Sequence, residues 1–500
     1  MLRLNIGLKM KKKSVAFNAI LNMLRMMLTV IVPLITFPYT SRIFLVEGNG
    51  HLSFAATITQ IFTLFASLGI YTYGVREGAK VRYDKSKFTT LAQELIAINM
   101  LSTVITYIVF IICVFYIPKM KEYKCMLLIY GVTIGFTALG LDWIYGAYEE
   151  YTYITIRQII CQVFTILAMI ILIHDKSDLY LWAAISVFSS VGANIFNFFN
   201  AKKYIYSYWP LRRKKLQIVR HIKPILILFA TQLATKIYSN LDIVLLGFWT
   251  SDYYIGLYNA SIKINSILIP CFTAMNPVFI PKIVGYIKKN QYTDFLDFFS
   301  KILRIMIGIG LPIVTGLEML SSNILCIIAG KPYMRADITM KILAPIILIS
   351  CCSNVFYYNF LIPKGRENDV LKCTVVSTVI NLIISIIFIP RLKQNGAAVG
   401  SLVAEIVALI LAIYISINID NNIKNHIPRI KNYILGSGFV AITCFICRII
   451  FDSIILETAL SCVCGVLVYF IVLVLFKDDC LFELFGYLGS FIKRKNNNEK

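Results

Sequence analysis

Long apolar stretches alternate with short polar segments along the whole chain. Each stretch reaches about 20 residues, the length that an α-helix needs to cross the hydrocarbon core of a bilayer. We expect fourteen spanning helices at 15–37, 48–71, 89–116, 125–147, 155–174, 179–200, 221–248, 254–280, 301–320, 339–362, 370–390, 396–417, 431–451 and 455–476. The pattern therefore predicts an all-α, polytopic membrane protein.

The first stretch carries a polar stripe at helical spacing. One face of that helix holds Asn18, Asn22, Arg25, Thr29, Pro33 and Thr36. An arginine in hydrocarbon costs at least roughly 2.5–3.5 kcal/mol, so this face is not expected to contact lipid. Two interpretations stay open. Arg25 pairs with a buried carboxylate for structural reasons, or the stripe lines a route for a polar or anionic cargo.

Three further stretches carry similar stripes. The span 48–71 contributes Ser53, Thr57, Gln60 and Ser67. The span 221–248 contributes Thr231, Gln232, Thr235, Lys236, Tyr238, Ser239, Asn240 and Asp242. The span 254–280 contributes Asn259, Lys263, Ser266 and Pro270. A single polar stripe can hold two helices together, but four stripes in corresponding positions indicate a shared central cavity.

Composition and charge agree with a membrane protein. Hydrophobic residues make up 58% of the chain and charged residues only 15%. The net charge of +23 does not indicate nucleic acid, because 34 of the 49 Lys and Arg residues fall in alternate loops and the two termini. Basic residues collect on cytoplasmic loops of membrane proteins. We therefore expect both termini in the cytoplasm.

The chain divides into two halves. The basic segment 201–220 separates a first half, 1–200, from a second half, 221–417, and 418–500 holds the last two spans and a tail. Gly50 and Gly256 each open the second helix of a pair after a short turn, 206 positions apart. Repeats of this kind are common in secondary transporters.

Other charged positions are candidates for gating or coupling. Glu405 lies near the middle of its span and is the better candidate for a coupling carboxylate, whereas Asp142 lies near a span end, where an ion pair is equally compatible. Arg76 and Glu77 are expected in a turn flanked by Gly74 and Gly78.

The sequence holds no nucleotide-binding loop of the GxxxxGK[ST] type and no HExxH or GxSxG motif. Nearly all the cysteines sit in apolar stretches and are expected to behave as small hydrophobic residues, so we expect no metal site and no cofactor. Without a nucleotide site, transport would be driven by a transmembrane gradient, or by the concentration gradient of the cargo itself.

Several segments carry a family resemblance. They are PLITFPYTSRIF, GIYTYGVRE, LGLDWIYGAYEEY, NLDIVLLGF, IGLYNASIKI, PKGRENDVLK and NGAAVGSLVAEIVALI. In this order, over most of residues 14–417, the chain resembles the Wzx-type polysaccharide flippases of the multidrug/oligosaccharidyl-lipid/polysaccharide (MOP) superfamily. The resemblance implies two pseudo-symmetric six-helix lobes around a central cavity, with two additional C-terminal helices.

The same resemblance implies export of undecaprenyl-diphosphate-linked oligosaccharide across the bacterial cytoplasmic membrane. Membrane lipid and a polysaccharide polymerase would be partners. Residues expected to line the cavity are Asn18, Asn22, Arg25, Gln60, Lys236, Asn240, Asp242, Asn259 and Lys263. Residues expected at gates or coupling positions are Arg42, Arg76, Glu77, Asp142 and Glu405. Cations facing a hydrated cavity would offset the cost of bringing a diphosphate into the membrane.

Three other functions compete. A cation-coupled multidrug exporter of the same superfamily would favour a carboxylate where the first span has Arg25. A membrane enzyme acting on the same glycan would favour a large outer loop with Arg or His, which the sequence lacks. A lipid II flippase would carry a related cargo with a different sugar.

The charge count predicts that the loop around 201–223 faces the cytoplasm. A Lys214→Cys variant should react with a membrane-impermeant maleimide in inverted vesicles and not in intact cells. Reaction from the outside alone would show that the topology is inverted.

Overall fold

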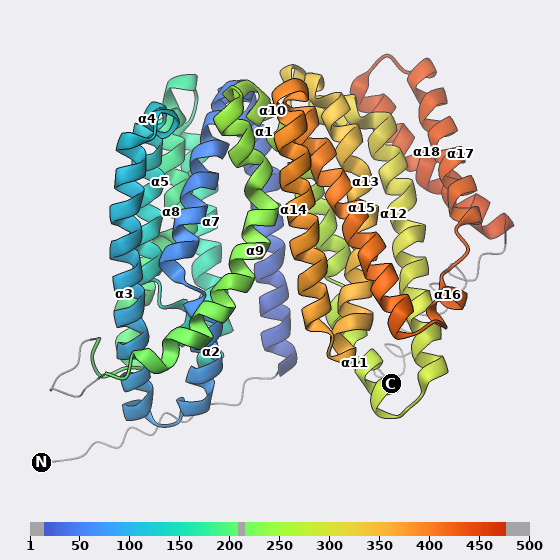
Figure 1. Ribbon diagram of the computed structural model, residues 1–500. Helices are drawn as coiled ribbons and strands as arrows, with labels where there is room; N and C mark the ends of the chain where they lie inside the picture. Colours follow the sequence, from blue (N-terminus) through green and yellow to red (C-terminus); the bar gives the residue numbers. More distant parts are fainter. Residues whose placement is uncertain (1–14, 209–215, 477–500) are drawn as a thin grey trace, which may run out of the picture. The chain divides into compact units, whose positions relative to one another are not determined.

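The computed structural model describes residues 15–208 and 216–476, with the backbone alone described for 15–30 and 277–278 (Figure 1). Within these residues every regular element is a helix. The α-helices are α1 (Val15–Ser67), α2 (Ile70–Val81), α3 (Lys85–Tyr116), α4 (Pro118–Glu122), α5 (Lys124–Leu139), α6 (Asp142–Ala147), α7 (Tyr151–Leu172), α8 (Leu179–Asn200), α9 (Val219–Trp249), α10 (Asp252–Thr273), α11 (Asn276–Lys288), α12 (Tyr292–Ala329), α13 (Asp337–Phe356), α14 (Glu367–Leu392), α15 (Gln394–Ile419), α16 (Ile423–His426), α17 (Lys431–Ile450) and α18 (Ile454–Leu475).

The prediction of an all-helical membrane protein with about fourteen spans is confirmed. Ten helical segments of the described chain are long and apolar enough to cross a membrane. The helices α9 and α10 have 31 and 22 residues but are not among these ten, because their polar side chains lower their hydropathy. One of the ten segments, Ile31–Val81, already contains the second half of α1, so the first half of α1 and α5 complete the predicted set of fourteen.

The first helix extends further than predicted. The chain is helical from Val15 to Ser67 except at Leu45, where φ is 55° and ψ is −165°. Instead of the turn expected over 38–47, the structure has a single non-helical residue, Leu45. Such a backbone conformation is rare for a residue with a side chain and costs about 1–3 kcal/mol, so neighbouring contacts must stabilise it.

The fourth predicted span, 125–147, is two helices and not one. The helix α5 ends before Gly140, Leu141 has a φ of 46°, and α6 begins at Asp142. The amide of Asn197 on α8 donates to Gly140 O at 2.6 Å and to Asp142 Oδ1 at 2.5 Å. These bonds satisfy a carbonyl that the break in the helix leaves without an intrahelical partner.

The turn predicted around Arg76 and Glu77 is wrong, because these residues lie in α2. The flanking glycines serve close packing and not a turn. A Cβ on Gly74 would lie 2.6 Å from the Trp143 ring, and one on Gly78 would lie 2.9 Å from Ala147 Cβ. The two glycines do have a structural role, but that role is close helix contact, which glycine permits as readily as it permits a turn.

The chain folds into two compact units. Unit 1 contains residues up to Thr36 and Ile58–Leu233, and unit 2 contains Phe37–Thr57 and Ala234 onward. The boundary at 233/234 falls inside α9. Residues 209–215 of the predicted linker, Lys214 included, lie outside the described residues.

Unit 1 is built on helix pairs and an aromatic core. The helix α8 packs on α5 and α7, and α2 packs on α6 and α3. The ring of Phe88 lies 4.8 Å from that of Tyr148, which in turn lies 4.5 Å from that of Tyr204. Asp84 caps α3 by accepting hydrogen bonds from the backbone of Lys87 and Ser86, which lower the pKa of its carboxyl.

Unit 2 places α13 at its centre, in contact with α10, α12 and α15. Its core includes the rings of Phe299, Phe356 and Phe360, with Phe299 and Phe356 centred 5.2 Å apart. The last two helices, α17 and α18, lie side by side and pack on α12 (Figure 1).

Candidate functional site

A polar face on α9 stands out among the spanning helices. Thr235, Lys236 and Ser239 are exposed near the middle of this helix. The Ser239 hydroxyl donates to Thr235 O at 2.9 Å, and the Asn240 amide donates to Lys236 O at 3.0 Å. The Ser239 hydroxyl and the Asn240 amide are thus partly satisfied within the helix, whereas the Lys236 side chain remains exposed.

The second cation of unit 2, Lys263, lies on α10 and is partly buried. Ion pairs within the described part of unit 2 include those of Lys341, Lys364, Arg366, Lys372, His51 and His426. Neither Lys236 nor Lys263 takes part in any of these pairs. Both ammonium groups are therefore available to an anionic ligand. Asn259, on the same helix as Lys263, is also partly buried.

Asp242 lies one helical turn beyond Tyr238 on α9 and is buried, with 5% of its surface exposed. Its carboxylate accepts hydrogen bonds from Tyr258 on α10 at 2.8 Å, from Ser385 on α14 at 3.2 Å and from Ser401 on α15. Four helices thus converge on one carboxylate. Gly400 makes this possible, because a Cβ there would lie 2.3 Å from Ser385 Oγ.

A second carboxylate lies one turn along the same pair of helices. The Tyr238 hydroxyl donates to Glu405 Oε1 at 2.6 Å. Tyr238 precedes Asp242 by four residues, and Ser401 precedes Glu405 by four, so the two carboxylate contacts form successive rungs between α9 and α15. No lysine or arginine within the described residues forms an ion pair with either carboxylate. Hydroxyl groups thus solvate both acids, and the Asn381 side chain also contributes at Asp242.

The other predicted residues lie in the first half of the chain. Asn18, Asn22 and Arg25 lie where no side chain is described. Gln60 is exposed in unit 1. Glu77 binds Lys80 at 2.8 Å and Arg76 at 3.1 Å on the surface of α2.

Two predicted gate residues make structural contacts. Asp142 forms an ion pair with Arg157 at 3.0 Å, beside the break between α5 and α6. Arg42 donates to Ile327 O at 2.5 Å and to Ile328 O at 3.4 Å, near the end of α12. A guanidinium placed there satisfies carbonyls that the helix end leaves open.

Sequence reasoning missed the hydroxyl partners of the two carboxylates. Tyr258, Ser385 and Ser401 were not candidates, although α14 carries a signal that could have found one of them. The buried face of α14 includes Ser377, Asn381 and Ser385, each four residues from the next. A polar stripe at that spacing in a spanning helix indicates a polar contact with neighbouring helices.

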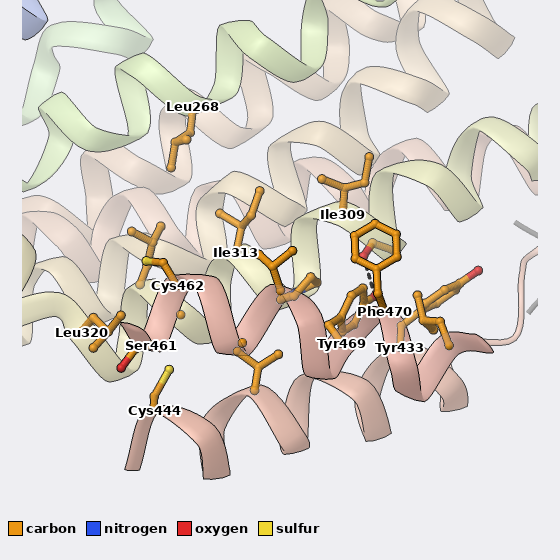
Figure 2. Close-up of a pocket in the computed structure, with 18 of the residues that line it drawn as sticks. Leu268, Ile309, Ile313, Leu320, Tyr433, Cys444, Ser461, Cys462, Tyr469 and Phe470 are labelled. Atoms are coloured by element: carbon orange, nitrogen blue, oxygen red, sulfur yellow. Dashed lines mark hydrogen bonds between the residues drawn. The ribbon is translucent and has the colours of Figure 1, made fainter. Parts of the chain in front are cut away.

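An apolar cavity of about 520 Å³ lies between α12, α17 and α18 (Figure 2). Its walls include Ile309 and Ile313 of α12, Tyr433 and Cys444 of α17, and Phe470 of α18. Figure 2 shows these side chains pointing into one space. The described lining contains almost no polar groups, so the cavity fits a hydrocarbon chain and not a sugar.

Known structures share this fold. The structure described as lipid II flippase MurJ, inward closed conformation, aligns with a TM-score of 0.71 at 14% identity, over 93% of this chain and 100% of that one. An inward-facing MATE family multidrug transporter of the MOP superfamily aligns with a TM-score of 0.57 at 11% identity, over 79% and 99%. The chain therefore has the multi-pass, all-helical membrane fold that MurJ and the MATE transporters share.

Sequence comparison then gives the family. The family described as "Polysaccharide biosynthesis protein" matches residues 15–286, and the chain belongs to that family. A relative from Escherichia coli strain K12, named "Putative O-antigen transporter", is 21% identical over 372 residues, which are 74% of this chain and 88% of the relative.

The geometry separates two kinds of charged residue in α9. Asp242→Ala should lower the free energy of unfolding by about 1–3 kcal/mol, because Tyr258, Ser385 and Ser401 would lose a buried acceptor. Lys236→Ala should change it by less than about 0.5 kcal/mol, because its side chain is exposed and forms no ion pair with the described residues. Thermal unfolding of the purified protein in detergent measures both. Equal destabilisation by the two variants would contradict this assignment.

Proposed function

We propose that this protein translocates a polyprenyl-diphosphate-linked oligosaccharide across the bacterial cytoplasmic membrane for surface polysaccharide synthesis. The observation that carries the proposal is the exposed polar face of α9, with Thr235, Lys236 and Ser239 at mid-span. Lipid would penalise such a face, so it serves a hydrated path. Family membership and the O-antigen relative support a glycan as the cargo.

The cargo has three chemically distinct parts, and the chain offers groups that suit each one. Lys236 and Lys263 are cations without an acidic partner in the described chain, and they would hold the diphosphate together with the predicted Arg25. Hydroxyl and amide groups such as Ser239, Asn240 and Asn259 suit sugar hydroxyls. A charge-assisted contact to phosphate is worth roughly twice a neutral hydrogen bond, so the cations would dominate binding.

The lipid part of the cargo would use apolar surfaces. The cavity between α12, α17 and α18 has about 520 Å³ and an apolar lining, within the roughly 300–1,000 Å³ typical of ligand pockets. A segment of a polyprenyl chain would fill it without leaving a polar group unsatisfied. The rest of the chain would stay in the bilayer, so the protein would move the polar head while the tail remains in contact with lipid.

Coupling would use the two carboxylates of unit 2. Asp242 and Glu405 sit inside the membrane-spanning helices. Within the described residues their partners are hydroxyl groups and, at Asp242, also the Asn381 side chain. Intramembrane carboxylates of this kind are expensive and usually mark ion or proton paths. We propose that a proton or cation from a transmembrane gradient binds at this pair and favours one arrangement of the units during alternating access.

The cation face can be tested by export in cells. Lys236→Ala and Arg25→Ala should each cause lipid-linked repeat units to accumulate on the cytoplasmic leaflet, with protein abundance unchanged. Lys236→Arg and Arg25→Lys should keep part of the export, because they preserve the charge and change only its geometry. Lys288→Ala, an exposed lysine on α11, is the matched control.

Full export by Lys236→Ala combined with Arg25→Ala would show that these charges do not carry the cargo. Export of a cationic drug instead, with no change in lipid-linked glycan, would favour the multidrug transporter function. Accumulation of lipid II alone would favour a lipid II flippase.

A further inference from the structure

We propose that residues Phe37–Thr57, here called the α1 corner, form a releasable latch on unit 2. These residues pack in unit 2, whereas the segments on both sides of them in the chain, up to Thr36 and from Ile58, pack in unit 1. Any rearrangement of the two units must therefore pull on this corner from both ends. The proposal rests on the proposed transport function, since a static protein would need no release.

The backbone of the corner is strained at its centre, and one tyrosine stabilises it at that point. Leu45 has a φ of 55°, which a residue with a side chain rarely adopts. The Tyr333 hydroxyl donates to Leu45 O at 2.8 Å and accepts from the Asn49 amide at 2.8 Å, and that amide also donates to Leu45 O at 3.0 Å. Tyr333 is fully buried in unit 2. Its hydroxyl thus secures the strained turn only while the corner is docked.

Two glycines fit the corner to α10 reciprocally. A Cβ on Gly50 would lie 1.8 Å from Asp252 O, and a Cβ on Gly256 would lie 2.0 Å from Val46 O. The atoms in the way belong to the backbone, so the helices themselves would have to separate. These are the two glycines at corresponding positions of the sequence repeat. Gly50 leaves room for the backbone of α10 near Gly256, and Gly256 leaves room for the backbone of the corner near Gly50.

Further contacts hold the corner at its margins. Gly247 on α9 admits Phe54, because a Cβ there would lie 2.0 Å from the Phe54 ring. His51 Nδ1 lies 2.9 Å from Asp252 Oδ2. Arg42 binds the carbonyls of Ile327 and Ile328. The latch thus combines a steric fit with a few directional bonds, and both are lost together when the corner lifts away.

The strained backbone of Leu45 favours release of the α1 corner, whereas its close packing on unit 2 favours docking. Docking supplies the hydrogen bonds that hold Leu45 in its rare conformation, and undocking lets Leu45 relax. Such a contact has two discrete states and not a continuum, as expected for a packed element. The docked state seen here is one end of the cycle, and transport passes through the undocked state.

Cysteine modification at Val46 reports the latch directly. Val46 is 3% exposed and its carbonyl lies against Gly256. In the full-length protein in lipid nanodiscs, the thiol introduced by Val46→Cys should react slowly with a maleimide. Peptide mass spectrometry separates this introduced thiol from the native cysteines. Adding Gly256→Ala should accelerate the reaction by about 5- to 150-fold, the shift expected from overpacking a close contact.

Two further variants make the result decisive. Gly285→Ala, on α11, adds a Cβ that would have no atom of the described residues within 4 Å, so this variant should keep the slow rate of the introduced thiol. Tyr333→Phe removes the bridging hydroxyl without adding bulk and should accelerate the reaction by roughly 2- to 10-fold. It replaces Gly256→Ala as the deciding variant if that protein fails to accumulate.

An unchanged rate in Tyr333→Phe and in a folded Gly256→Ala protein would overturn the latch. An equal acceleration in Gly285→Ala would also overturn it, by showing general loosening. The measurement needs no cargo, so it separates the latch from the proposed function. If the glycan assay fails but the thiol rate responds to these variants, the flippase function alone is rejected. If glycan export is observed but the thiol rate does not respond, the latch alone is rejected.

Discussion

The cost of placing polar groups in hydrocarbon governs this structure more than any other constraint. Each unsatisfied or charged group at mid-membrane must find a partner, contact water or be neutralised. The helix α9 shows two of these solutions within two turns. Lys236 is exposed and has no ion-pair partner among the described residues, which favours a hydrated surrounding, whereas Asp242 is buried and accepts hydrogen bonds from hydroxyls of three other helices. One helix thus carries both the proposed cargo face and the proposed coupling site.

Close helix contact is the second recurring device, and glycine provides it. Gly400 brings α15 onto α14 beside the Asp242 network, Gly74 brings α2 onto Trp143, and Gly50 with Gly256 seat the α1 corner. Helices in membranes lack a strong hydrophobic drive to associate, so small residues that allow close approach take over part of that role. In the proposed latch, Gly50 and Gly256 meet backbone atoms and not interlocking side chains, which suits a contact that must separate.

The sequence was sufficient for the span pattern and for the polar face of α9, because both depend on periodicity within one segment. It was not sufficient for the Asp242 network, whose members come from α10, α14 and α15 and share no local pattern. The stripe of Ser377, Asn381 and Ser385 on α14 was a usable signal. The conformation of Leu45 was beyond prediction, because leucine gives no sign of a positive φ. Gly74 and Gly78 were interpreted as turn residues, because glycine gives the same local signal for a turn and for close packing.

Reconstitution of the purified protein tests the central claim most directly, namely that α9 provides a polar path for a lipid-linked glycan. Liposomes would contain the protein and an undecaprenyl-diphosphate-linked oligosaccharide, and a sugar-modifying enzyme outside would consume whatever reaches the outer leaflet. The account predicts that consumption proceeds beyond the outer-leaflet share with the native protein, and that Lys236→Ala stops it at that share. Consumption that stops at the outer-leaflet share with the native protein, or that continues unchanged in Lys236→Ala, would contradict the account.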